Sequence, residues 1–113
     1  MNARLAMLIG ALALLPIAPP AADADETGMV GLHSLRREGG KTCMSEHEHH
    51  GSSSGHASRR AAEAAAGYDW QGFTAWEYGT SWGSFAAAAG KKMSCSHGAG
   101  GWSCEVDARP CRR

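Results

Sequence analysis

Four of the six histidines in this sequence lie between residues 44 and 60, in the stretch MSEHEHHGSSSGHASRR. If residues 41–50 form a strand, His47 and His49 project from the same face, because side chains alternate along a strand. Two imidazoles at alternate positions can bind one Zn²⁺ or Cu²⁺ ion. The H-x-H spacing therefore predicts a metal site, but the pattern is short and fixes no third ligand.

The last strand of the sequence supplies candidate partners for these two histidines. In the register that the expected cysteine pairing imposes, Asp107 lies opposite His47 and Glu105 lies opposite His49. Either carboxylate could be a metal ligand or accept a hydrogen bond from a ligating imidazole. His56 could approach the ion from the following loop. The alternative interpretation is a solvated strand with His–carboxylate pairs and no ion.

A second candidate site lies at the start of the helix that follows. Ser58 is a favourable N-cap residue, and Arg59 and Arg60 come directly after it. Free backbone N–H groups at a helix N-terminus, together with these side chains, could bind phosphate or a carboxylate. The plainer interpretation is a solvated loop with an N-cap, and the sequence has no phosphate-binding G-x-x-x-x-G-K-[ST] motif.

Enzymatic activity has little support in the sequence. All four cysteines are expected in disulfides, which leaves no thiol nucleophile. The serines at 52–54 stand near His56, but no carboxylate at a diagnostic spacing would orient that imidazole. Most aromatic residues fit buried helical faces, and only Tyr68, Tyr78 and Trp102 are plausible surface rings. We therefore expect a protein that is not an enzyme.

The first 24 residues have the features of a cleaved signal peptide. Arg4 precedes an apolar run at 5–18, and the small residues of ADA at 22–24 predict cleavage before Asp25. An uncleaved anchor is the alternative, which the early prolines argue against. The rest of the sequence has no apolar run of that length, so no transmembrane segment is expected after cleavage. We therefore expect the protein to be periplasmic or secreted.

Size, charge and cysteine content restrict the function further. The chain has eleven basic and eleven acidic residues and a formal net charge of zero, which argues against a nucleic-acid partner. A domain this small has a limited core and usually needs covalent support. Four cysteines in an exported chain predict two disulfides.

The order of elements follows from hydrophobic periodicity and from glycine. Residues 25–40 are expected to form a flexible lead-in, with a short edge strand near 29–32, before a single small domain at 41–113. The domain is predicted to contain a strand at 41–50, a loop at 51–58, a helix at 59–78, a shorter helix at 81–89, and strands at 91–96 and 102–108. The buried face of the long helix is predicted to consist of Ala62, Ala66, Trp70, Phe73 and Trp76.

The cysteines fix the expected sheet. A hairpin centred on residues 99–100 places Cys95 opposite Cys104, which leaves Cys43 to pair with Cys111. The last strand can then lie antiparallel between the other two. The predicted fold is α+β, with a three-stranded antiparallel sheet of order 1-3-2 packed on one long and one short helix and held by two disulfides.

The stretches HEHHGSSSGHASRRAAEAAAGYDW, WEYGTSW and WSCEVDARPC resemble small exported bacterial proteins of uncharacterised function. The order of elements is also similar to that of dodecins, in which a three-stranded antiparallel sheet cradles a helix. The first resemblance implies no activity, and the second concerns topology only, so it implies no flavin site.

The function that we expect is that of a non-catalytic exported protein that binds a divalent metal, Zn²⁺ or Cu²⁺, through its H-x-H pair. The alternative is a ligand-free module of the cell envelope that interacts with a protein partner or forms a homo-oligomer. The open face of the predicted sheet is where such a second copy would pack.

Overall fold

The computed structural model describes residues 26–113, and the predicted signal peptide lies outside this part of the chain. In chain order the elements are the 3₁₀ helix η1 (Gly28–Leu32), β1 (Leu35–Glu38), β2 (Lys41–Met44), β3 (His49–His56), α1 (Arg59–Tyr78), the 3₁₀ turns η2 (Thr80–Trp82) and η3 (Phe85–Ala87), β4 (Ala89–Gly98), β5 (Gly101–Arg109) and β6 (Cys111–Arg112).

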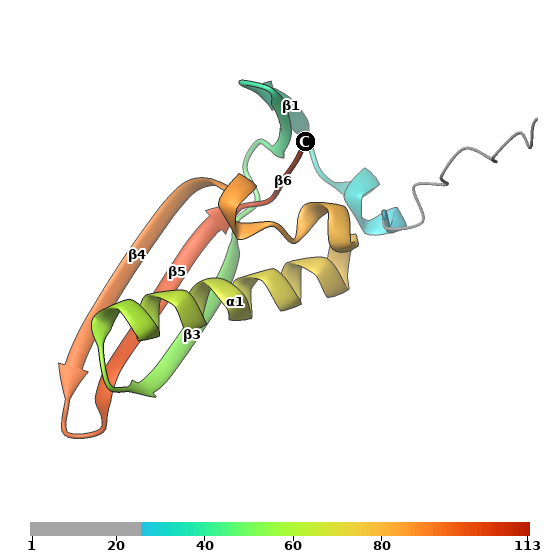
Figure 1. Ribbon diagram of the computed structural model, residues 1–113. Coiled ribbons are helices and arrows are strands. Elements are labelled where there is room, and N and C mark those ends of the chain that lie inside the picture. Colours follow the sequence, from blue (N-terminus) through green and yellow to red (C-terminus); the bar gives the residue numbers. More distant parts are fainter. Residues whose placement is uncertain (1–25) are drawn as a thin grey trace, which may run out of the picture.

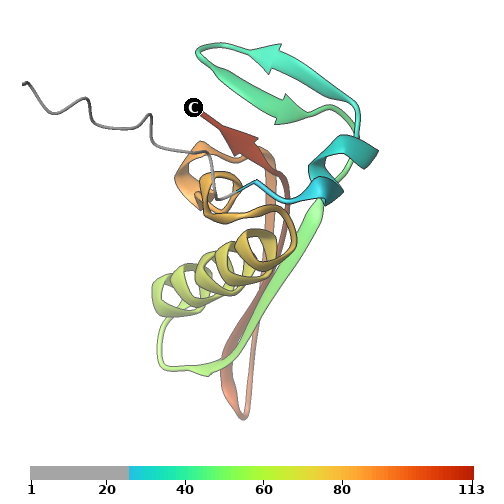
Figure 2. The same ribbon diagram turned by 90° about the vertical axis from the view of Figure 1, so that its right-hand side faces the viewer.

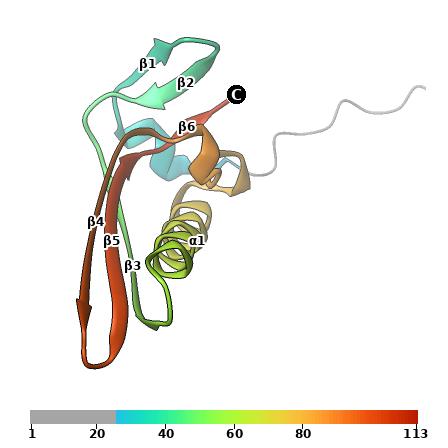
Figure 3. The ribbon, with the colours of Figure 1, turned by 60° about the vertical axis from the view of Figure 1, so that its left-hand side comes forward.

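The main layer is an antiparallel sheet of order β3-β5-β4, and α1 covers one of its faces (Figures 1 and 3). The α+β class and the predicted order, first strand, last strand, middle strand, are confirmed. A second antiparallel sheet, β1-β2-β6, was not predicted. It lies at the opposite end of the molecule from the turn of the β4–β5 hairpin (Figure 2).

The predicted strand at 41–50 is wrong, because its two halves belong to different sheets. Residues 41–44 pair with β1 and β6, residues 45–48 connect the sheets, and the first strand of the main sheet runs over 49–56, where a loop was predicted. The cause lies at the other end of the chain. Pro110 interrupts the last strand, so that Cys111, and Cys43 with it, falls outside the main sheet.

Helix α1 is predicted correctly in extent but not in its buried face. Ser58 caps it by accepting a hydrogen bond from the Ala61 N–H at 3.1 Å, and Gly79 ends it with a φ of 104°. Phe73 and Trp76 are 50% and 78% exposed, contrary to the prediction. The buried stripe instead follows steps of four residues throughout: Ala62, Ala66, Trp70, Thr74 and Tyr78.

The predicted helix at 81–89 is also wrong. Two separate 3₁₀ turns occupy this region, and β4 begins at Ala89. Gly83 interrupts the segment where it passes α1: a Cβ at this position would lie 2.7 Å from the Cβ of Ala75. Trp82 is buried, whereas Ala86 is exposed.

Two hydrophobic clusters include residues of α1. The larger one joins α1 to the main sheet through Ala62, Ala66, Trp70, Ala88, Cys104, Val106 and Ala108. The smaller one consists of Val30, Met44, Tyr78 and Trp82. Residues 26–40, for which a flexible lead-in with a strand near 29–32 was predicted, contain η1 and β1, and η1 covers the end of α1 (Figure 2).

Both predicted disulfides, Cys43–Cys111 and Cys95–Cys104, are confirmed. They are consistent with an oxidising compartment outside the cytoplasm. Within residues 26–113, no helix combines the length and the apolar character needed to cross a bilayer.

Candidate metal centre

Three histidines from separate segments converge where η1, the connection at 45–48 and the start of β3 meet. The ring centroids of His33 and His47 are 4.5 Å apart, and those of His47 and His49 are 5.1 Å apart. The last turn of α1 closes the group: the centroid of the Tyr78 ring lies 5.2 Å from that of His33 and 4.9 Å from that of His49. We call His33, His47, His49, Glu77 and Tyr78 the histidine cluster.

Hydrogen bonds connect the polar atoms of the histidine cluster. The Tyr78 hydroxyl oxygen lies 3.2 Å from His49 Nε2 and 3.3 Å from His33 Nε2. His49 Nε2 also lies 2.9 Å from Glu77 Oε2. Since Glu77 and Tyr78 are consecutive on α1, the helix presents a carboxylate and a phenol to the same imidazole.

The outer ring nitrogens of His33 and His49 also have partners. His33 Nδ1 lies 3.1 Å from the Met29 carbonyl oxygen, so that it donates its N–H there and leaves the lone pair on Nε2. His49 Nδ1 lies 3.2 Å from Thr74 Oγ1, a hydroxyl that can donate or accept. This arrangement, in which one nitrogen faces the cluster and the other is hydrogen-bonded outside it, is typical of metal-ligating histidines.

The three histidines of the cluster differ in their exposure to solvent. His47 is exposed, His33 is half-buried, and His49 is buried, with 3% of its surface exposed. Burial lowers the pKa of His49; Glu77 opposes this shift, and the neighbouring His47 and His33 add to it. His49 is therefore neutral at pH 7, which is the form that binds metal.

Tyr78 is held in its neutral form. Burial, with a smaller contribution from the Glu77 carboxylate, raises the pKa of Tyr78 to about 12. Its hydroxyl is consequently a hydrogen-bond donor as well as an acceptor at pH 7.

The histidine cluster contains two of the five predicted metal ligands, His47 and His49. The predicted register is wrong, because β3 begins two residues after His47: His49 pairs with Ala108, His50 with Asp107 and Ser52 with Glu105. Asp107 accepts a hydrogen bond from His50 Nδ1 at 3.0 Å.

The other two predicted ligands are also remote from the cluster. Glu105 lies on the sheet face away from α1, beside Ser52 and Ser94. His56 pairs with Trp102 at the far end of β3. The two carboxylates are separated from the cluster because the first strand is shifted and the register that placed them does not exist, and His56 lies in β3 rather than in the predicted loop.

His33, Glu77 and Tyr78 were missed. His33 is a single histidine in a segment with no sustained periodicity, and the sequence contains no signal that would place it against α1. Tyr78 was expected at the surface and is buried. The steps of four from Ala62 to Tyr78 are the one sequence signal that could have placed this ring inside.

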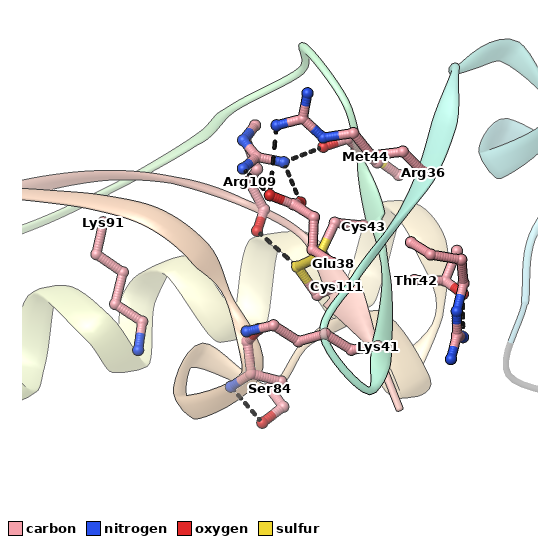
Figure 4. Close-up of a disulfide and its surroundings, with 12 residues drawn as sticks. Arg36, Glu38, Lys41, Thr42, Cys43, Met44, Ser84, Lys91, Arg109 and Cys111 are labelled. Carbon is pink, nitrogen blue, oxygen red and sulfur yellow. Dashed lines mark hydrogen bonds and ion pairs between the residues drawn. A yellow bond between two sulfur atoms is a disulfide. The ribbon is translucent and has the colours of Figure 1, made fainter.

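One group of three ligand-type side chains in residues 26–113 lies within 4.8 Å of one another, and it consists of Glu38, Cys43 and Cys111. The two sulfur atoms are bonded to each other, so neither is a thiolate that could bind metal. Arg109 instead binds Glu38 beside this disulfide (Figure 4). The nitrogens of the histidine cluster are less tightly grouped, and metal binding requires their side chains to close on the ion.

At the predicted anion site at the start of α1, Ser58 caps the helix. Ser58 accepts the hydrogen bond described above, and Arg59 Nε pairs with Glu63 Oε1 at 2.9 Å. Arg60 is exposed. Anion binding stays a prediction, and two of its three proposed side chains already have protein partners.

Comparisons with protein-family models, curated proteins and solved structures find no match to this chain. The resemblance to small exported bacterial proteins stays an expectation from the sequence.

Proposed function

We propose that this protein is a non-catalytic, periplasmic or secreted metal-binding protein, and that the histidine cluster binds one divalent ion, Zn²⁺ or Cu²⁺. Two disulfides and the predicted signal peptide support export. Two of the proposed ligands, His47 and His49, are the H-x-H pair of the sequence, and we add His33 and Glu77 because their side chains contact Tyr78 and His49.

The observation that supports this proposal most directly is the convergence of three imidazoles and a carboxylate from four chain segments. With Zn–N and Zn–O bonds of about 2.0–2.1 Å, tetrahedral ligand atoms stand roughly 3.3 Å apart. His49 Nε2 and Glu77 Oε2 are already 2.9 Å apart, so an ion could replace the proton between them with a small movement. His47, which is exposed, gives the ion a path from solvent.

The test is metal binding by the oxidised, exported protein, measured by titration calorimetry and native mass spectrometry with Zn²⁺ and with Cu²⁺. One ion per chain is expected. His33→Ala and His47→Ala should each weaken binding by about tenfold or more, because each removes a ligand and even hydrogen-bond partners of ligands have effects of that size.

His97→Ala is the matched control. This histidine is exposed beside Trp102 on the β4–β5 hairpin, with ring centroids 4.8 Å apart, and takes no part in the cluster. Its removal should leave the affinity unchanged. Equal affinity in all four proteins, or no bound ion in any of them, would contradict the proposal.

A second candidate function is self-association, favoured by two stacked aromatic rings next to the cluster. The centroids of Phe73 and Trp76 are 6.1 Å apart, and both rings are exposed. The open face of the main sheet, where pairing was expected, presents serines and Glu105 rather than apolar side chains. Molar mass measured by light scattering should then fall in Trp76→Ala, with or without metal, whereas a monomer at every concentration would exclude this function.

A further inference from the structure

Tyr78 places its hydroxyl oxygen between two proposed ligand nitrogens. The oxygen is hydrogen-bonded to Nε2 of both His33 and His49, at 3.3 and 3.2 Å. For one ion to bind both imidazoles with bonds of about 2.0–2.1 Å, the two nitrogens must approach the same point. The atom that now occupies the space between them is the phenol oxygen.

The Tyr78 side chain cannot leave this position. It is fully buried in a cluster with Val30, Met44 and Trp82. Its main-chain carbonyl accepts a hydrogen bond from the Thr27 N–H at 3.1 Å, which fixes η1 and the end of α1 together around the ring. A rotated ring would leave a cavity in this cluster, which destabilises the folded state.

We propose that Tyr78 is itself a metal ligand, through its phenol oxygen, and that the site is consequently one for Cu²⁺ rather than Zn²⁺. The inference rests on the proposed function and names the ion of the same site. It is supported by the position of the Tyr78 phenol oxygen between the two Nε2 atoms, by the burial of the ring and by the Glu77 carboxylate beside it.

The ligand set explains the choice of ion. Two or three imidazole nitrogens with a phenolate and a carboxylate oxygen form a mixed N,O set, which suits the tetragonal geometry of Cu²⁺. Cu²⁺ is also the strongest binder among the divalent ions of its row. On binding, the Tyr78 O–H bond breaks, an O–Cu bond forms and the proton passes to solvent, while copper stays in the +2 state.

The experiment compares visible absorption of the oxidised protein, titrated with Cu²⁺, with that of Tyr78→Phe. A phenolate bound to Cu²⁺ has a charge-transfer band, which imidazole and carboxylate ligands do not produce in the same region. The wild type should show this band at one Cu²⁺ per chain. Tyr78→Phe should lose the band and bind Cu²⁺ about tenfold more weakly or worse.

Tyr68→Phe is the control, because Tyr68 lies on α1 with 77% of its surface exposed. It should keep both the band and the affinity. Resonance Raman spectra of the wild type, excited in the band, should show phenolate ring modes, so the inference can be tested even if Tyr78→Phe fails to fold.

The outcomes separate the two proposals. Copper bound at one ion per chain without a charge-transfer band would overturn the role of Tyr78 and leave the metal site intact. A Tyr78→Phe variant with the band and affinity of the wild type would do the same. No stoichiometric copper in the wild type would overturn both.

Discussion

At the scale of single residues, the ion pair between Glu38 and Arg109 joins the two sheets. Arg109 Nη1 lies 2.6 Å and Nη2 2.7 Å from the two carboxylate oxygens of Glu38, a bidentate arrangement (Figure 4). The same Nη1 donates to the Met44 carbonyl oxygen at 2.7 Å. One guanidinium on β5 therefore holds both strands of the β1–β2 hairpin.

This ion pair makes the stability dependent on pH. The hydrogen bond from Arg109 lowers the pKa of Glu38 to about 2, from an ordinary value of 4.5. A carboxyl whose pKa is lower in the folded state stabilises that state above pH 4.5, and this contribution is lost as the pH falls from 4.5 through 2.

Glu38→Gln should accordingly lower the free energy of unfolding at pH 7, and the difference from wild type should disappear near pH 2. Urea denaturation at a series of pH values measures this, with Glu46→Gln as the control, since Glu46 is exposed in the connection at 45–48. A gap between Glu38→Gln and wild type that is the same at pH 7 and at pH 2 would exclude the ion pair as its cause.

At this scale the sequence predicted the residues whose chemistry is local and missed those placed by tertiary contacts. The pair His47 and His49 was recognised from its own spacing, and Ser58 from its place before the helix. His33 reaches the cluster because η1 packs on the end of α1, a contact between segments about 45 residues apart, as the hydrogen bond between His33 and Tyr78 shows. Glu77 reaches it because the last turn of α1 lies against His49 of β3. Nothing local to either residue indicates it.

At the scale of elements, α1 packs closely on β3 near the start of the main sheet. Gly51 is the point of closest approach: a Cβ there would lie 2.4 Å from the Ala66 carbonyl oxygen and 2.7 Å from the Cβ of Trp70. Trp70 Nε1 donates to the main-chain oxygens of His49 and Ala108, at 2.9 and 3.2 Å. The helix is thus fixed on the strand within two residues of the histidine cluster.

Gly51→Ala should destabilise the protein by about 1–3 kcal/mol, because the added methyl group forces the helix away from the strand. Thermal and urea denaturation measure the loss. Since His49 lies two residues away, the same variant should also bind metal more weakly. An unchanged midpoint of unfolding would show that the helix can move off β3 freely.

Gly72→Ala, on the helix that Gly51 contacts, is the control. Position 72 is exposed, and a Cβ there would meet nothing within 4 Å. Alanine should stabilise the helix by up to about 1 kcal/mol, because glycine loses more backbone entropy on folding. The opposite signs of the two glycine substitutions distinguish a steric effect from a general effect of changing glycine.

The elements themselves were predictable where a covalent or periodic pattern specified them. The long helix, the hairpin register from Cys95 and Cys104, and the strand order all follow from such patterns. The start of the first strand did not, because the Ser-rich stretch at 52–54 has the composition of a loop but is fixed by pairing with β5 on one side and α1 on the other. Tertiary contacts here override local propensity.

At the scale of the whole molecule, the two disulfides constrain different parts of the chain. Cys95–Cys104 joins directly paired residues of one hairpin, with a sequence separation of 9. Cys43–Cys111 joins β2 to β6 with a separation of 68 and closes the chain around the main layer. The segment that contains His33, from η1 to β2, is therefore covalently tied to the C-terminus.

Removing one disulfide or the other should therefore lower the free energy of unfolding by different amounts. On the loop-entropy model, Cys43–Cys111 contributes about 4.4 kcal/mol and Cys95–Cys104 about 2.7 kcal/mol to the free energy of unfolding. The variant Cys43→Ala/Cys111→Ala should also bind metal more weakly than its stability alone explains, because His33 is then less well positioned. Cys95→Ala/Cys104→Ala, whose disulfide lies in the distant hairpin, should retain the wild-type affinity wherever it is folded.

Urea denaturation and copper titration of both double variants test this together. If the two variants lose equal stability, loop length does not determine the contribution of these disulfides. If both keep the wild-type metal affinity while folded, the packing of η1 on α1 is sufficient to hold His33 against Tyr78 without the covalent link. The expected result, a loss of affinity confined to Cys43→Ala/Cys111→Ala, would make the small second sheet the element that holds the metal centre together.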